Sequence, residues 1–201
     1  STKYNMTTDS SIIERVEIYM NNFFNTELAA DLYFHNIIHT REVVEAITEI
    51  GIHEGLTQDE LEPLKIAAWF HDAGYCCKYI GHEDESIKIA RAFLSDQDYP
   101  VDKVSLVISC IEATRYPQKP RNLYAEILCD ADLYHFSCKD YDRHEQNLRK
   151  EWAVYLKKQY TDKEWVEENC YLLSLHQYFT HYGKEVLRAK KDENMAKMLC
   201  R

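Results

Sequence analysis

The sequence predicts an all-α protein, a compact bundle of about seven to ten helices. Apolar residues recur at three- and four-residue steps along most of the chain, which is the spacing of one helix face. Only 5 Gly and 4 Pro occur among 201 residues, so long helices are favoured over many short strands. No stretch shows the regular apolar and polar alternation of a half-buried strand. Short loops between antiparallel neighbours would complete a single-domain bundle.

The first two helices are predicted from their apolar stripes. The first helix begins at Ser11 and continues past Phe23. The second begins near His39 and carries apolar residues at helical spacing. Gly51 and Gly55 are expected past its end, because glycine often follows the last helical residue.

The third helix is predicted to begin with a capping box made by Thr57 and Glu60. It reaches the doublet His71-Asp72, and Gly74 provides a place for it to end. Further helices are expected near residues 82–95, after Pro100, across 123–133, and across 140–179 with a break near 160–162.

Residues 11–201 are predicted to form one helical domain, preceded by a flexible tail at residues 1–10 that is polar and aperiodic. A hydrophobic content of 45% is enough for a full core. The sequence shows no apolar run long enough to cross a membrane and no signal peptide. We therefore expect a soluble, cytoplasmic protein without a membrane partner.

The formal net charge is −10, which makes a nucleic-acid polymer an unfavourable partner because an acidic surface repels phosphate backbones. A small anionic substrate remains compatible with this charge, since a bound metal ion can reverse the local sign. The sequence leaves the oligomeric state open.

The cysteines are predicted to be reduced core residues. There are 7 of them, an odd number, with no Cys-x-x-Cys pair. Several lie within apolar stretches, as expected for free thiols that pack like small hydrophobic side chains. The adjacent pair Cys76-Cys77 admits a redox interpretation, which base rates disfavour.

Three places in the sequence put polar side chains where an apolar helix would normally exclude them: His39, the doublet His71-Asp72, and the pair Asp130 and Asp132. Burying a carboxylate or an imidazole without a partner costs several kcal/mol. Imidazole nitrogen and carboxylate oxygen both suit a divalent metal ion, which would be a common partner for all of them. Taken alone, the doublet is equally compatible with a buried ion pair at a helix end.

These segments resemble the HD-domain superfamily of metal-dependent phosphohydrolases, whose pattern is His, then His-Asp, then Asp. The matching stretches are YFHNIIHT at residues 33–40, WFHDAG at 69–74 and ILCDADL at 127–133. The resemblance covers roughly residues 30–155, in the expected order and spacing. It implies an HD-type helical bundle and four metal ligands, namely His39, His71, Asp72 and Asp132.

The resemblance leaves the closing ligand open between two aspartates. Asp132 is the first choice, because it follows Ala131 and precedes Leu133 as the ligand does in many relatives; Asp130 is the alternative, or a partner of a ligand. Some relatives bind a second metal through a later histidine, and this chain has Tyr116 in that place. We therefore expect one divalent ion, which could be Mn, Co, Ni, Fe, Zn or Mg.

Candidate catalytic residues follow from the same resemblance. Asp72 or Glu83 would take the proton of the attacking water, and His82 would contact the leaving phosphate. His35, four residues before His39, could share its helix face and form a two-histidine metal pair, but the favoured interpretation is that it orients a ligand or caps the helix. The basic residues proposed as phosphate clamps are Lys78, Arg115 and Arg149. The plainer interpretations are an acidic first helix turn for 82–85 and solvated surface positions for the arginines.

The function that the resemblance implies is hydrolysis of a phosphomonoester or phosphoanhydride of a nucleotide or similar small metabolite, by metal-activated water. One alternative is an iron-dependent oxygenase of the same superfamily, which would need a second metal. The other is a non-catalytic, metal-containing domain that senses a nucleotide.

Overall fold

The computed structural model describes residues 10–201, so nearly all of the predicted tail at residues 1–10 lies outside the described residues. The described part contains nine α-helices, three short helical turns and no strand, which confirms the all-α prediction. None of these helices is both long and apolar enough to cross a membrane. The α-helices are α1 (Ile12–Glu27), α2 (Ile37–His53), α3 (Gln58–Phe70), α4 (His82–Asp96), α5 (Val101–Ala113), α6 (Leu123–Asp132), α7 (Tyr141–Tyr155), α8 (Asp162–Leu175) and α9 (Arg188–Leu199). The short turns are η1 (Ala73–Cys76), η2 (Tyr134–Ser137) and η3 (Gly183–Leu187).

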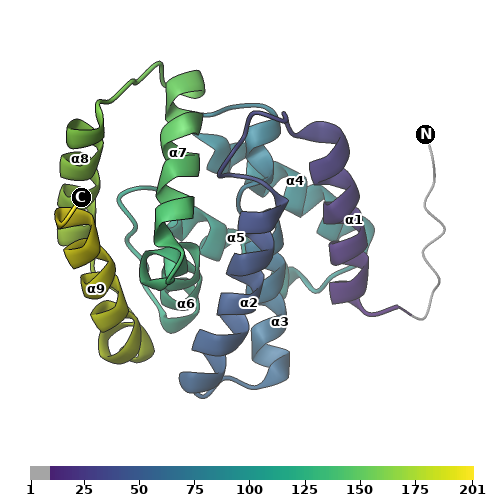
Figure 1. Cartoon of the computed structure of the whole chain (residues 1–201). Helices are drawn as coiled ribbons and strands as arrows, with labels where there is room; N and C mark the ends of the chain where they lie inside the picture. The colour runs from purple at the N-terminus through teal and green to yellow at the C-terminus, as the bar shows by residue number, and fades with distance from the viewer. Residues whose placement is uncertain (1–9) are drawn as a thin grey trace.

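The helices that carry the three polar motifs are neighbours in space. Helix α2 packs against α3 and α6, and α5 packs against α3, α4 and α6. Figure 1 shows α1 at one edge of the molecule and α8 with α9 at the opposite edge, with α2, α3 and α6 between them. The main core is filled by fully buried apolar side chains that include Ile47, Leu64, Phe70, Ile111 and Leu128. This packing brings segments far apart in the sequence to one place.

Helix α2 begins at Ile37, two residues before the predicted start near His39. The cause is the side chain of Asn36, whose Oδ1 accepts a hydrogen bond from the backbone N–H of Ile38 at 3.0 Å. Asparagine is a favoured residue at this capping position. His39 therefore lies within the first turn of a capped helix and is not the residue at which the helix begins.

The glycine prediction for the end of α2 is half right. Gly55 lies past the helix with a φ of 85°, the left-handed conformation that glycine adopts without strain. Gly51 lies inside α2 instead of past its end. A Cβ at this position would be 2.2 Å from Cδ2 of Leu61 on α3, so the close packing of the two helices favours glycine here. The capping box of Thr57 and Glu60 is present as predicted.

The cysteines are free thiols, but most of them are not core residues. Cys110 and Cys129 are buried as predicted, whereas Cys77 and Cys200 are exposed. The prediction is wrong for the other five. Cys170 lies on a helix with one solvent-facing side, and Cys76, Cys77, Cys138 and Cys200 lie in or directly after a short turn or a helix end.

Gly74 lets the backbone of η1 approach α4 closely. A Cβ on Gly74 would be 1.8 Å from the carbonyl oxygen of His82 and 2.7 Å from the backbone nitrogen of Ser86. Ser86 joins the two segments, since its Oγ accepts from Gly74 N at 2.8 Å and donates to the carbonyl of His71 at 2.8 Å. The end of α3 is thereby fixed against the start of α4.

We predict that Gly74→Ala destabilises the protein by about 3 kcal/mol, because the new methyl group meets backbone atoms that cannot rotate away. Gly55→Ala is the matched control, since its Cβ would have no described atom within 4 Å and its positive φ should cost only about 1–2 kcal/mol. Urea unfolding of both variants measures the difference. Equal losses in the two variants would contradict the close approach at Gly74.

Candidate metal centre

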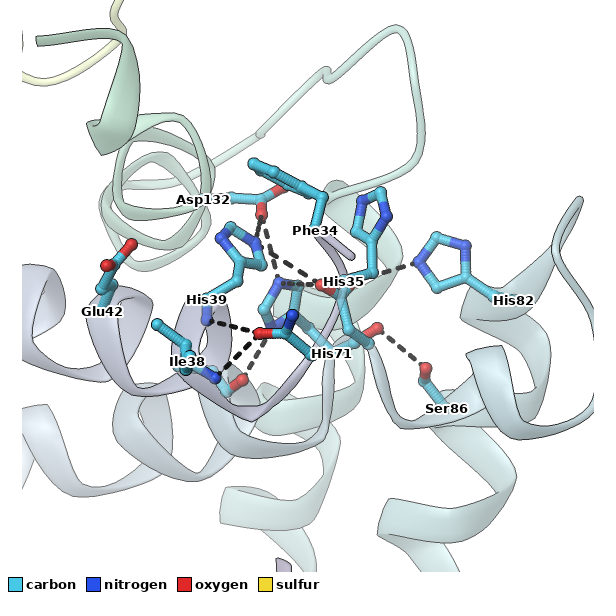
Figure 2. Close-up of polar contacts among 12 residues, drawn as sticks. Phe34, His35, Ile38, His39, Glu42, His71, His82, Ser86 and Asp132 are labelled. Carbon is cyan, nitrogen blue, oxygen red and sulfur yellow. Dashed lines mark hydrogen bonds and ion pairs between the residues drawn. The ribbon is translucent and has the colours of Figure 1, made fainter. Parts of the chain in front are cut away.

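Four polar side chains from three helices converge at one point. His39 comes from the first turn of α2, His71 and Asp72 follow the last residue of α3, and Asp132 ends α6. One donor atom from each lies within 4.8 Å of the donor atoms of the others. Figure 2 shows His39, His71 and Asp132 directed toward one another, with His82 to one side. The structure therefore brings together the four predicted ligands.

The distances within this four-residue cluster are short. His39 Nε2 is 3.2 Å from Asp132 Oδ1 and 3.5 Å from Asp72 Oδ2. His71 Nε2 is 3.1 Å from Asp132 Oδ1 and 3.2 Å from Asp72 Oδ2. Two imidazole nitrogens thus face the same two carboxylate oxygens.

The doublet can converge because α3 ends there. Residues adjacent in a helix point about 100° apart, so neighbours rarely meet at one ligand in mid-helix. His71 keeps helical backbone angles, but Asp72 leaves the helix with a φ of −106° and a ψ of 5°. This change of direction aims the carboxylate of Asp72 at the imidazole of His71.

The hydrogen bond made by Nδ1 of His71 decides that its second ring nitrogen, Nε2, faces the cluster. His71 Nδ1 is 2.6 Å from the carbonyl oxygen of Ala68, which can only accept, so Nδ1 carries the hydrogen. In the neutral ring the lone pair of Nε2 then points at the oxygens of Asp72 and Asp132. Such an arrangement is unfavourable unless a cation lies among the three groups.

Burial of His71 and Asp72 strengthens the need for a cation between them. His71 and Asp72 are nearly inaccessible to solvent, and Asp72 Oδ2 has no hydrogen-bond partner within the described residues. Burial lowers the pKa of His71, but the carboxylates of Asp72 and Asp132 outweigh it and raise the pKa well above its usual value. For Asp72 the two effects are reversed: burial raises its pKa, but the nearby imidazoles outweigh burial and hold this pKa well below its usual range.

The donor set fits a divalent metal ion. A proton on His71 offsets one of the two carboxylate charges, whereas a divalent metal ion offsets both and can use all four donor atoms at once. Two nitrogens and two carboxylate oxygens suit Mn, Fe, Co, Ni or Zn, and leave an octahedral ion two positions for water and substrate. The ligand role of each residue stays a prediction.

The carboxylate of Asp130 is hydrogen-bonded away from the cluster, which favours Asp132 as the closing ligand. Its fully buried carboxylate accepts hydrogen bonds from the backbone N–H groups of Phe179 and Thr180 at 2.9 Å and from Thr180 Oγ1 at 2.6 Å. Burial raises the pKa of Asp130 to about 6, more than these hydrogen bonds lower it. Asp130 therefore anchors the segment before α9 and does not point at the cluster.

The predicted catalytic residues His82 and Glu83 lie beside the cluster. His82 Nε2 is 3.2 Å from Asp72 Oδ1, and His82 Nδ1 is 3.6 Å from Glu83 Oε1. The ring of Tyr75 stacks on His82 with centroids 3.8 Å apart. Arg115 Nη1 is 3.7 Å from Glu83 Oε2. A continuous polar path therefore leads from Asp72 through His82 to Glu83.

The three proposed phosphate clamps lie in different surroundings. Arg115 pairs with Glu83 near the cluster, whereas none of the described contacts connects Lys78 or Arg149 to it. Lys78 is half exposed and lies 3.8 Å from Glu85. Arg149 donates to Asp162 and to the carbonyl of Tyr160, so it holds the loop between α7 and α8. Arg115 is thus the best placed of the three.

Glu151 supports the site, although the sequence assigns it no role. Its carboxylate is fully buried and lies 2.5 Å from His35 Nδ1. It also accepts a hydrogen bond from Tyr79 Oη at 2.6 Å and from the backbone N–H of Phe34 at 3.1 Å. His35 is therefore fixed by α7 just before α2 begins. A glutamate among other charged residues gives no signal of such burial in the sequence.

Gln118 is a second site residue without a sequence signal. Its Nε2 donates to Asp132 Oδ2 at 3.1 Å, which leaves Asp132 Oδ1 directed at the two imidazoles. Tyr116, which stands where some relatives have a histidine, is 76% exposed. The loop before α6 therefore contributes an amide to the described site through Gln118.

Comparison with known proteins gives one match. A model of the HD domain family matches residues 36–137. This range covers just over half of the chain, runs from the cap of α2 to the end of η2, and includes the whole four-residue cluster. No curated protein and no solved structure matches the chain.

We predict opposite outcomes for the two neighbouring aspartates. Asp130→Ala should destabilise the protein by about 3 kcal/mol, because it leaves buried N–H and O–H donors unpaired, while metal binding in the folded fraction persists. Asp132→Ala should abolish metal binding with a smaller loss of stability. Urea unfolding and elemental analysis of both variants test this, and metal loss in the Asp130 variant alone would reverse the assignment.

Proposed function

The chain belongs to the HD domain family, and on this premise we propose that it is a metal-dependent phosphohydrolase acting on a small phosphorylated metabolite or nucleotide. The observation that carries the proposal is the convergence of the donor atoms of His39, His71, Asp72 and Asp132, of which the first three residues are buried. The same residues are those that the family resemblance implies as ligands.

The four residues of the cluster would hold the metal ion, and the residues around it would manage protons and phosphate. When bound, a divalent ion polarises a phosphoryl oxygen and lowers the pKa of a water molecule. His71 presents Nε2 because Ala68 holds Nδ1. Gln118 orients Asp132 by occupying its second oxygen.

Glu83 is the better candidate for the general base. Asp72 has one oxygen 3.2 Å from His82 Nε2, and its other oxygen faces His39 and His71 inside the cluster, where a metal ion would take it. The described contacts of the Glu83 carboxylate are with His82 and Arg115 and not with the four-residue cluster. It can accept a proton directly or through His82, which lies between Glu83 and Asp72.

His82 and Arg115 are the groups proposed to contact the phosphate. The stacked ring of Tyr75 holds the imidazole of His82 beside the cluster. Arg115 also pairs with Asp84 and Glu112, and these carboxylates raise its pKa and keep it charged. A guanidinium beside Glu83 has the N–H donors that a phosphate oxygen accepts from.

We predict that Glu83→Gln lowers kcat by about 100- to 10,000-fold and leaves metal content unchanged, because it removes a proton acceptor without touching a ligand. Release of inorganic phosphate from a panel of nucleotides and sugar phosphates, with Mn²⁺, Co²⁺, Ni²⁺ or Mg²⁺ added, provides the assay. Glu85→Gln is the matched control on the same helix turn, and its kcat should stay near that of the wild type.

Two results of this assay would contradict the proposal. Metal-loaded wild-type protein that hydrolyses no phosphate ester but binds one nucleotide tightly would favour the sensing role. Equal turnover in Glu83→Gln and wild type would remove Glu83 from the mechanism and leave Asp72 as the candidate base.

A further inference from the structure

A second group of metal-ligating side chains lies where η2 is followed by α7. Cys138 comes directly after η2, Asp140 precedes α7, and His144 lies in the first turn of α7. One donor atom from each lies within 4.8 Å of the other two. We propose that Cys138, Asp140 and His144 bind a second divalent metal ion of the zinc type. This site shares no residue with the four-residue cluster, and the proposal does not depend on hydrolysis.

The helical spacing places two of the donors together. Asp140 and His144 are four residues apart, so their side chains share one helix face, and Asp140 Oδ1 is 3.3 Å from His144 Nε2. His144 is only 4% exposed, which fixes its ring. Among the described residues, the hydrogen-bond contact of the Cys138 thiol is a long one of 3.8 Å to the carbonyl of Tyr134. The thiol can therefore turn toward a metal ion at little cost.

The guanidinium of Arg143 already lies beside two of the proposed ligands. Arg143 Nη2 is 2.8 Å from Asp140 Oδ2 and 3.4 Å from His144 Nε2. The same atom is 3.4 Å from Glu42 Oε1. Because the side chain of Arg143 is 48% exposed, it can turn into solvent and leave these groups to a metal ion. The guanidinium would then compete with the metal ion.

Glu42 on α2 completes the surroundings of the proposed site. Its Oε2 is 3.7 Å from His144 Nδ1. A carboxylate beside a metal-binding imidazole orients the ring and raises its basicity. Glu42 can therefore act as a partner of His144 or supply a fourth donor.

The adjoining cavity also favours a cation. A cavity of about 240 Å³ is lined by the three proposed ligands and by His39 of the four-residue cluster. Its wall includes the carboxylates of Glu42, Glu45, Glu49 and Asp140, and no Lys or Arg is among its lining residues.

His135 adds an unsatisfied donor or acceptor to the same cavity. It is 7% exposed, and its Nδ1 has no hydrogen-bond partner among the described residues. Its ring centroid lies 5.4 Å from that of His144. The cavity thus combines excess negative charge with a buried, unpaired imidazole nitrogen beside the proposed ligands.

Sulfur distinguishes the two sites chemically. A thiolate ligand selects Zn²⁺ and Co²⁺ over Mg²⁺ and Mn²⁺. The four-residue cluster offers nitrogen and oxygen only. A cobalt ion at the second site would therefore give a sulfur-to-cobalt charge-transfer absorption that a cobalt ion at the first site cannot give.

The test is titration of the full chain with Co²⁺ under reducing conditions, followed by absorption spectroscopy and elemental analysis. Wild type should bind two ions and show the charge-transfer band. Cys138→Ser should lose the band and bind one ion. Asp72→Asn should lose an ion and keep the band, so failure of one site is distinguished from failure of the other.

Three further variants make the test decisive. Asp140→Asn, which changes a half-exposed side chain, should weaken the band without unfolding the protein. Arg143→Gln should tighten cobalt binding, because it removes the competing guanidinium. Cys200→Ser is the control at an exposed cysteine and should behave as wild type. A band that survives in Cys138→Ser, or no band in wild type, would overturn the proposal; the second result would favour an organic amine as the partner of the cavity's carboxylates.

Discussion

The mutual approach of two buried imidazole nitrogens and two carboxylates, one of them buried, is the constraint on which the rest of the site depends. His71 cannot turn its ring away, because Ala68 holds the opposite nitrogen, and Asp72 Oδ2 finds no donor within the described residues. Without a cation these groups would repel one another in a region that is largely shielded from water. A proton satisfies this demand in part, and a divalent ion satisfies it with all four donors.

The fold supplies what this constraint requires. Each ligand lies at the beginning or end of a helix, where the backbone changes direction and adjacent side chains can converge. The ends are then held from outside the cluster. Ser86 ties α3 to α4, Asp130 ties α6 to the segment before α9, and Glu151 ties α7 to the residues before α2. The surrounding helices thus position the site through buried polar contacts as well as through the apolar core.

The sequence predicts the parts of this structure that depend on local patterns. Helical periodicity and the capping box at Thr57 indicate the helices, and polar residues in apolar segments indicate the four converging side chains. The roles of Glu151 and Gln118 could not be predicted, because each depends on one long-range contact and neither breaks a local pattern. Gly51 was misplaced for the same reason, since only the approach of α3 explains it.

The central claim is that the cluster of His39, His71, Asp72 and Asp132 binds a divalent metal ion. The most direct measurement is anomalous X-ray diffraction from crystals of the Mn²⁺- or Co²⁺-loaded protein, with data collected at the absorption edge of the metal. We expect an anomalous peak within coordination distance of His39 Nε2, His71 Nε2 and Asp132 Oδ1, close to the unpaired oxygen of Asp72. A well-ordered cluster without such a peak at saturating metal, or a closing contact from Asp130, would contradict it.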